Sequence, residues 1–340
     1  KARKPVSISM VSVSGPPPEL PTSPRAAPAK TNSPLSEGIV GARLNLFWQE
    51  WKDLGASPWI VRTLRRGFLI KFKQLPPLTS VPRPFALPRS AERLQALDTE
   101  IQKMIAKKAV EPAIPGYYSH IFVVPKHSGG WRPVINLSAL QPFVNTPTFS
   151  METAESIRLA LPKDSWVVSL DLKDAFFHIP IHPRSRRFLR FAYQEQVWQF
   201  RALPFGLSPA PWIFTMVMRE VQIMAHRSGI CLHMYLDDWI IRNQSRHLLE
   251  MHRDTVMGLC RRLGLLINRE KSDLSPSRDF VFVGYRYVTP LGLVFPSQER
   301  ITKIRALLAL FLSGAPQSAL RWQSMLGLLA ATEKLVPFGR

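Results

Sequence analysis

The sequence predicts an α+β protein in which short antiparallel strands are backed by amphipathic helices. Apolar, β-prone runs occur in pairs separated by short turns, which is typical of hairpins. Longer stretches between them carry apolar residues at helical spacing. With 340 residues, of which 46% are apolar, the chain is long enough for two or three packed subdomains.

The chain is strongly basic, with 45 Lys and Arg residues against 24 Asp and Glu residues and a net charge of +21. A folded protein with this charge most often binds a polyanion, usually nucleic acid, and a ribosome-like structural binder is the alternative. The two cysteines, Cys231 and Cys260, exclude a disulfide framework or a zinc cluster. We therefore expect an intracellular setting, in the cytoplasm or the nucleus. No run approaches the ~18–20 apolar residues of a membrane span, so we expect no membrane partner.

The N-terminal part divides into a linker and an extension. Residues 1–37 are rich in Pro, Ser and Ala and poor in aromatic residues, which predicts a disordered linker. Order is expected to begin near Leu44, in an extension over residues 38–90 that ends in a Pro-rich, extended stretch. The chain begins with Lys1 rather than Met, so we expect a piece of a longer polyprotein.

Residues 91–165 are expected to contain a helix and a hairpin. Ser90 is expected to cap the helix and Pro112 to end it. The hairpin pairs residues 119–126 with residues 131–137. Lys126 and Arg132 flank its turn. Basic residues at a hairpin tip are usually only solvated, but this pair could hold a triphosphate.

Three of the six acidic residues between Trp166 and Ile241 end or turn strands. Asp171 ends a buried strand, and Asp237 and Asp238 form a two-acid turn between apolar flanks. Adjacent like charges are unfavourable unless a cation neutralises them, and hard oxygen ligands favour Mg²⁺ or Mn²⁺. A lone Asp-Asp pair is more often a solvated turn. The upstream Asp171 and the downstream Lys271 favour a metal site, with Asp238 as the weaker ligand or a nearby charge.

The remaining elements complete an alternation of hairpins and helices. A hairpin is expected over residues 188–203, and a helix opened by Ser208 follows a loop at 203–207. An amphipathic helix over 248–263 should end at Gly264. Residues 282–285 are expected to form a short strand with a turn glycine, followed by helices at 297–312 and 317–331.

Five motifs, taken together in order and spacing, resemble those of reverse transcriptases. They cover residues 169–177, 203–207, 235–238, 263–272 and 282–285. The resemblance runs from about residue 75 to 330. It implies a right-hand polymerase with fingers at 91–165, palm and primer grip at 166–290 and a partial thumb at 291–340, the palm being an antiparallel sheet backed by helices. The residues within these motifs, together with the upstream block from Leu46 to Val61, are most similar to those of LTR-class retrotransposons of the DIRS type.

The resemblance also implies an RNA-directed DNA polymerase that extends a primer on a template–primer duplex with deoxynucleoside triphosphates. Two Mg²⁺ ions would assist, with Mn²⁺ able to replace them. The residues matching the catalytic and metal-binding aspartates are Asp171, Asp237 and Asp238, and Lys271 matches the lysine proposed to protonate pyrophosphate. The nucleotide-binding positions are Lys126, Arg132, Asp174, Ala175, Phe176 and Phe205. Of these, Phe176 matches the steric gate against ribonucleotides, and Phe205 replaces the Gln of retroviral enzymes. The primer grip matches Phe282, Val283, Gly284 and Tyr285, and the duplex contacts of the thumb match Arg300, Lys303 and Arg305.

The C-terminal part of the chain has few acidic residues. After Pro290 the only ones are Glu299 and Glu333. A ribonuclease H site needs a carboxylate cluster around two metals, so we expect that domain downstream in the full polyprotein. Two rival functions stay open. The first is a catalytically inactive relic that only binds nucleic acid, which the intact aspartates disfavour, and the second is an RNA-synthesising polymerase, which Phe176 disfavours.

Overall fold

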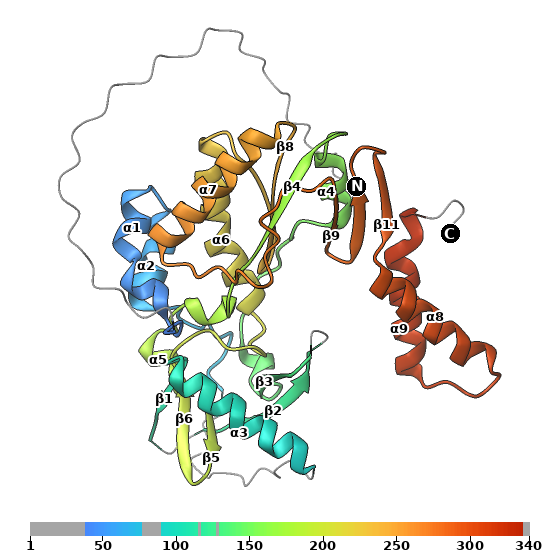
Figure 1. Cartoon of the computed structure of the whole chain (residues 1–340). Coiled ribbons are helices and arrows are strands. Elements are labelled where there is room, and N and C mark those ends of the chain that lie inside the picture. The colour runs from blue at the N-terminus through green and yellow to red at the C-terminus, as the bar shows by residue number, and fades with distance from the viewer. Residues whose placement is uncertain (1–37, 77–89, 115–116, 127–128, 336–340) are drawn as a thin grey trace, which may run out of the picture. The chain divides into compact units, whose positions relative to one another are not determined.

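The computed structural model describes residues 38–76, 90–114, 117–126 and 129–335 (Figure 1). The expected linker at 1–37 and most of the Pro-rich stretch, residues 77–89, lie outside these residues. None of the helices in the described ranges is long and apolar enough to cross a membrane.

The described strands form four antiparallel sheets: the hairpin β2–β3 and three three-stranded sheets ordered β1-β6-β5, β4-β8-β7 and β11-β10-β9. This agrees with the expected pairing of neighbouring strands into hairpins. The strands are β1 Val110–Pro112, β2 His120–Pro125, β3 Trp131–Asn136, β4 Trp166–Asp171, β5 Arg190–Tyr193, β6 Gln196–Phe200, β7 Cys231–Tyr235, β8 Asp238–Asn243, β9 Asp279–Phe282, β10 Tyr285–Val288 and β11 Leu293–Pro296.

Helices lie between the strands along the chain, and the longest of them pack on the sheets. The α-helices are α1 Trp48–Asp53, α2 Pro58–Arg66, α3 Ala91–Ala106, α4 Ala154–Ala160, α5 Pro183–Arg186, α6 Ala210–Arg227, α7 Arg246–Leu263, α8 Gln298–Leu312 and α9 Ala319–Thr332. The 3₁₀ helices are η1 Arg43–Leu46, η2 Gln141–Phe143, η3 Ala175–His178 and η4 Glu333–Leu335.

The sheet β4-β8-β7 is buried on both faces. Helices α6 and α7 contact its strands, and alternate residues such as Leu170 and Trp239 join the main hydrophobic core. Their neighbours Val167 and Ile240 point to the opposite face, where they form a second cluster with Ile157 of α4. Packing on both faces fixes the register of this sheet, because a one-residue slip would exchange the two cores. The sheet is therefore a rigid platform for the ends of its strands.

The predicted helix after Ser90 is shorter than expected. It ends at Ala106, and Lys108 turns the chain in the left-handed region with φ of 54°. Pro112 does not end the helix but closes strand β1, which pairs with β6. β1 lies at the edge of its sheet, where a residue without an N–H group is tolerated. Ser90 occupies the N-cap position, but its side chain accepts no hydrogen bond there.

The segment expected to be a short strand around Gly284 is a hairpin turn instead. Phe282 ends β9, Tyr285 begins β10, and the two residues between them have φ of 49° and 76°. Two successive left-handed residues form the turn that suits a two-residue hairpin. Val283 is β-branched and rarely adopts this conformation, so the sequence carries little signal for the turn.

The N-terminal extension is fastened to the end of α7. The indole Nε1 of Trp51 donates to the carbonyl of Leu263 at 2.9 Å, and Arg43 Nε donates to the carbonyl of Gly264 at 3.0 Å. Gly264 ends α7 with φ of 83°, as the sequence predicted. The extension therefore satisfies carbonyl groups that the helix end leaves without partners.

Candidate active site

The three aspartates singled out in the sequence meet at one end of the central sheet. Asp171, the last residue of β4, pairs in register with Asp238, the first residue of β8. Asp237 lies in the β7–β8 turn after Leu236, and its carbonyl accepts a hydrogen bond from the N–H of Leu172 at 3.1 Å. Only one of the two adjacent acids is in the turn, because Asp238 already belongs to the strand.

Burial and neighbouring carboxylates raise the pKa of Asp171 and of Asp238. Partial removal of water and the neighbouring Asp237 raise the pKa of Asp171. The same causes, with Asp171 as a further neighbour, raise the pKa of Asp238 to about 6. Lys271 acts in the opposite direction on both. The end of the sheet is therefore a place where added positive charge is favourable.

Two polar residues that the sequence analysis did not single out hold Asp171 in place. The backbone N–H of Asp171 donates to Ser272 Oγ at 3.0 Å, and its carbonyl accepts from the N–H of Asn268 at 2.8 Å. The side chain of Asn268 also hydrogen-bonds the Asp171 carboxylate. Both residues lie in the motif at 263–272, and this position was the one feature of the sequence that could have indicated their role.

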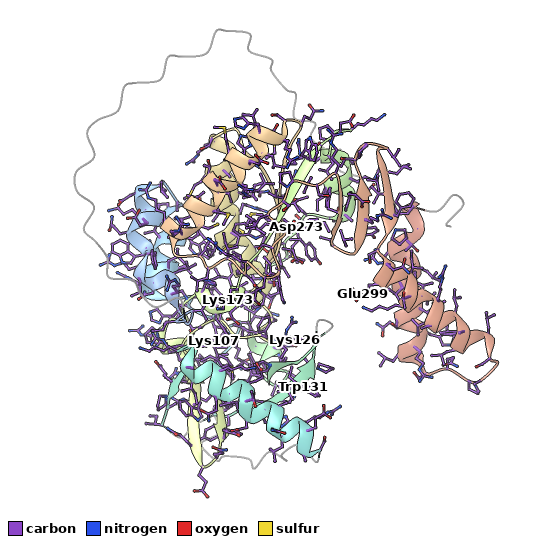
Figure 2. The ribbon with its side chains drawn as sticks, in the orientation of Figure 1. Lys107, Lys126, Trp131, Lys173, Asp273 and Glu299 are labelled. Carbon is purple, nitrogen blue, oxygen red and sulfur yellow. The ribbon has the colours of Figure 1, made fainter. Side chains whose placement is uncertain are left out.

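A cavity of about 310 Å³ opens in front of Asp171 and Asp237, whereas Asp238 does not line it. It brings Asp171, Asp237 and Lys271 together with Lys126 and Arg132 of the β2–β3 hairpin. The cavity is also lined by four charged residues that the sequence analysis did not predict. Three belong to α3 and the turn after it, and one follows β4: Glu100, Lys103, Lys107 and Lys173. Figure 2 labels Lys107, Lys126 and Lys173 in this part of the molecule. The cavity thus combines a carboxylate side with a cationic side, as an anionic substrate with bound cations would require.

Asp174 and Ala175 line the cavity, as expected for the nucleotide pocket. Asp174 has φ of 50° and forms an ion pair with Lys107 at 2.8 Å. This pair joins the start of η3 to the end of α3, although the two residues are 67 positions apart.

Phe176 does not line the cavity. It is 8% exposed, and its ring stacks on Phe205 at a centroid distance of 4.9 Å. Phe205 does line the cavity, and the guanidinium of Arg132 lies 4.9 Å over its ring. At this position the chain therefore has an aromatic surface that a cation covers. Phe177 contributes a second aromatic wall.

The donor set suits a hard divalent cation. In the part of the chain that the structure describes, no three His, Cys, Asp or Glu side chains are already arranged around a metal position. Mg²⁺ commonly takes only one or two protein carboxylates and completes its shell with water and substrate phosphates. The mutual repulsion of Asp171, Asp237 and Asp238 would be relieved by a cation bound at such a partly built site.

The expected primer-grip and thumb residues contact one another. The guanidinium of Arg300 lies 4.2 Å over the ring of Tyr285, and a Cβ on Gly284 would come within 2.6 Å of Arg300 Nη2. The hydroxyl of Tyr285 donates to the carbonyl of Ala331 in α9. Arg300 therefore packs α8 against the β9–β10 hairpin. Of the other two expected duplex contacts, Lys303 pairs with Glu299 at 2.6 Å, and Arg305 is exposed.

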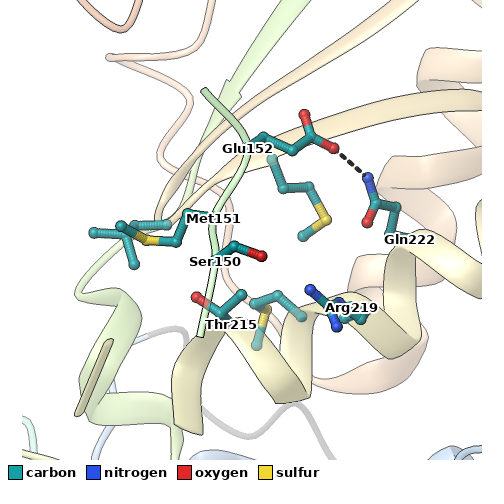
Figure 3. Close-up of a pocket in the computed structure, with 9 residues that line it drawn as sticks. Ser150, Met151, Glu152, Thr215, Arg219 and Gln222 are labelled. Carbon is teal, nitrogen blue, oxygen red and sulfur yellow. Dashed lines mark hydrogen bonds between the residues drawn. The ribbon is translucent and has the colours of Figure 1, made fainter. Parts of the chain in front are cut away.

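A polar network that the sequence analysis missed supports β7 from the side. Glu152 accepts a hydrogen bond from Gln222 Nε2 at 2.8 Å (Figure 3). It also accepts one from His233 Nδ1 at 3.1 Å. Gln222 also donates to the carbonyl of Leu232, and Arg242 Nε donates to His233 Nε2 at 3.3 Å. Burial opposes ionisation of Glu152, but the hydrogen bonds from His233 and Gln222 outweigh it and keep its pKa below the usual range. The network ties the strand that leads into the Asp237 turn to α6.

We expect Glu152→Ala to lower the free energy of unfolding by about 1–3 kcal/mol, because two partly buried donors lose their acceptor. Glu152→Gln, which keeps an acceptor oxygen, should lose clearly less. Urea unfolding followed by circular dichroism measures both, and the exposed Glu270→Ala serves as the control. Equal losses for the three variants would contradict a role of the network in stability.

His178, in η3, is a fully buried histidine next to the cavity. Its Nε2 accepts from the N–H of Leu266 at 3.1 Å, and its Nδ1 donates to the carbonyl of Ala175 at 3.1 Å. Burial lowers the pKa of His178 to about 4, so the ring is neutral in the native state at neutral pH. Protonation would remove the acceptor that Leu266 uses.

This histidine makes stability pH-dependent. Because the native pKa lies below the unfolded value of about 6.5, the unfolded state takes up a proton first as the pH falls. Stability should therefore decrease from about pH 6.5 down to about pH 4, by roughly 3 kcal/mol in all, and stay level below that. Urea unfolding between pH 7 and pH 4.5 tests this. The His178→Gln variant should lose less stability than the wild type over that range, and identical slopes would refute the assignment.

Residues 124–287 match the family model described as reverse transcriptase (RNA-dependent DNA polymerase). The Gag-Pol polyprotein of Rous sarcoma virus subgroup C (strain Prague) is 27% identical over 213 residues, which are 59% of this chain and 13% of that protein. A retrovirus-related Pol polyprotein from transposon 412 of Drosophila melanogaster is 27% identical over 200 residues, or 57% of this chain and 16% of that protein.

Among solved structures, the foamy viral protease-reverse transcriptase dRH in complex with double-stranded DNA superposes with a TM-score of 0.65 at 18% identity. The match covers 94% of this chain and 56% of that one. The described residues thus have the right-hand polymerase fold, with the antiparallel sheet β4-β8-β7 and its helices as the palm. The chain spans only a small part of the length of the matched polyproteins, and within it residues 124–287 are similar to the reverse transcriptase domains of retroelement Pol polyproteins.

Proposed function

We propose that this chain is an RNA-directed DNA polymerase, a nucleotidyltransferase that extends a primer with deoxynucleoside triphosphates. The observation that carries the proposal is the cavity in which Asp171 and Asp237 face Lys126, Arg132 and Lys271. An anionic triphosphate fits the cationic wall, and the carboxylates fit the divalent cations that accompany it.

The proposed roles follow from position. Lys126 and Arg132 hold the triphosphate, and Asp174 and Ala175 form the floor of its pocket. The primer 3′-oxygen attacks the α-phosphorus near the Asp237 turn, and the bond to pyrophosphate breaks. Lys271 can supply a proton to the departing pyrophosphate. Two Mg²⁺ ions bound with the nucleotide at Asp171 and Asp237, with Asp238 beside them, would lower the charge repulsion between primer, triphosphate and carboxylates.

Further parts of the proposal concern the duplex and the wider protein. Gly284 and Tyr285 would contact the primer strand as part of a primer grip, and the exposed Arg305 would contact duplex phosphates. We also propose a ribonuclease H domain elsewhere in the full polyprotein, an origin in an LTR-class element of the DIRS type, and an intracellular site of action. The boundaries of fingers, palm and thumb given above are part of the same proposal.

Primer extension tests the function. The purified chain is supplied with an RNA template, a DNA primer, Mg²⁺ and either deoxynucleotides or ribonucleotides. The expected result is extension with deoxynucleotides only. Absence of product on both RNA and DNA templates, with duplex binding retained, would favour a relic that only binds nucleic acid.

A further inference from the structure

A second hollow, separate from the catalytic cavity, lies on the N-terminal extension. It measures about 340 Å³. Helices α1 and α2, which lie beside α7 in Figure 1, and the loop between them supply its lining. We call it the N-terminal groove, and its lining residues are Trp48, Lys52, Ala56, Pro58, Val61, Arg62, Arg65 and Arg66. The catalytic cavity shares none of them.

All charged residues that line the N-terminal groove are basic. Four of its lining residues are exposed cations, and none is acidic. Within the described ranges, no ion pair joins any of these four to an acid, whereas many exposed cations elsewhere are paired. The nearby Glu50 forms its ion pair with Arg262 of α7, whose Nε lies 2.7 Å from Glu50 Oε2. The groove therefore keeps an uncompensated positive charge in a hollow, which attracts a polyanion.

The groove also has an aromatic and apolar wall. The indole of Trp48 is partly exposed, and the guanidinium of Arg65 lies 4.7 Å from its ring centroid. Ala56 and Val61 add apolar surface within the hollow. A free phosphate ion would need only the cations. Cations beside an aromatic ring and apolar surface suit a sugar-phosphate backbone with unpaired bases.

The positive surface continues beyond the groove. The backbone of Gly67, directly after α2, lies against that of His182, where a Cβ would come within 2.4 Å. Besides partial burial, the charges of Arg184, Arg186 and Arg66 hold the pKa of His182 below its usual value. A further cation, Arg227 at the end of α6, lies beside Gly55 in the loop between α1 and α2. Arg186 is paired with Glu111 at 2.9 Å, so Arg66, Arg184 and Arg227 are the cations that extend this surface. A row of separate cations fits a chain of phosphates better than a single anion.

We propose that the N-terminal groove binds single-stranded nucleic acid outside the polymerase cleft. The phosphates contact Lys52, Arg62 and Arg66, and a base stacks near Trp48 and Arg65. This goes beyond the proposed polymerase activity, because the groove can be occupied while a duplex lies at the catalytic cavity.

Fluorescence anisotropy with labelled 20-nucleotide single strands, one of RNA and one of DNA, tests the proposal. The full chain is first saturated with an unlabelled blunt duplex. The wild type should still bind the labelled strand. The double variant Arg62→Gln/Arg66→Gln should bind it about 10-fold more weakly. The slope of log K against log salt concentration should also be shallower by about 1.4, because two phosphate contacts are lost.

The matched control is Arg93→Gln/Lys163→Gln, which removes the same charge from two exposed residues outside both cavities. It should bind the strand like the wild type. Equal weakening by both double variants, or loss of all single-strand binding once duplex is present, would overturn the proposal. So would a groove variant that keeps strand binding but loses binding to vesicles of anionic phospholipid, since that outcome assigns the groove to a membrane surface. Circular dichroism shows that both variants are folded. A chain that extends no primer but still binds the strand in the groove would refute only the polymerase proposal.

Discussion

Replacing Asp237 by Asn is expected to reduce primer extension by at least about 10³-fold while duplex binding stays within about twofold of the wild type. Asn keeps the shape of the turn and the carbonyl that accepts from Leu172, so the sheet should be unaffected. What is lost is one negative charge facing the cationic wall of the cavity. Single-turnover extension with a labelled primer measures the rate, and anisotropy with the duplex measures binding.

Asp273→Asn is the matched control for this substitution. Asp273 is an exposed acid in the segment that runs beside β4, and its Oδ1 accepts from the N–H of Ser275, a bond that an amide oxygen preserves. Its side chain does not line the cavity. Extension by this variant should equal that of the wild type. A wild-type rate in Asp237→Asn, or an equal loss in both variants, would contradict the assignment of Asp237 to the reaction.

Local patterns in the sequence were sufficient for the centre of this site. The apolar flanks and the two adjacent acids predicted the hairpin of β7 and β8, and the buried run ending in Asp171 predicted a further strand. The structure pairs Asp171 with Asp238 in that sheet. Such predictions succeed because an apolar, β-prone run bounded by polar turn residues marks a buried strand from local sequence alone.

Contacts between distant segments could not be predicted in this way. The Lys107–Asp174 ion pair and the Glu152–His233 hydrogen bond join residues 67 and 81 positions apart, and nothing local distinguishes these side chains from solvated ones. Arg300 was expected to face a duplex, yet it packs on Tyr285. The position of a long, flexible side chain depends on what the fold brings near it, and a helical spacing does not record that.

The second large effect concerns Phe176 and the choice between deoxynucleotides and ribonucleotides. Phe176→Val is expected to raise ribonucleotide use relative to deoxynucleotide use about 100-fold, since bulk that would collide with a 2′-hydroxyl is removed. The ratio is measured by primer extension with each nucleotide at several concentrations. Because the ratio compares two substrates of one enzyme, a partial loss of folded protein does not affect it.

Phe205→Val shows by which route Phe176 acts. Phe205 lines the cavity and rests on Phe176, so Phe176 reaches a ribose either directly, after a change of its side-chain position, or by holding Phe205 in place. If Phe176 acts through Phe205, both variants should relax discrimination. If it acts directly, Phe205→Val should raise KM for both nucleotides alike, through loss of its contact with Arg132, and leave their ratio unchanged. Phe214→Leu, which alters the opposite neighbour of Phe176 within the core, is the control and should keep the wild-type ratio. An unchanged ratio in both Phe176→Val and Phe205→Val would exclude the gate from this aromatic pair and leave Phe177, the other ring lining the cavity, as the residue to test.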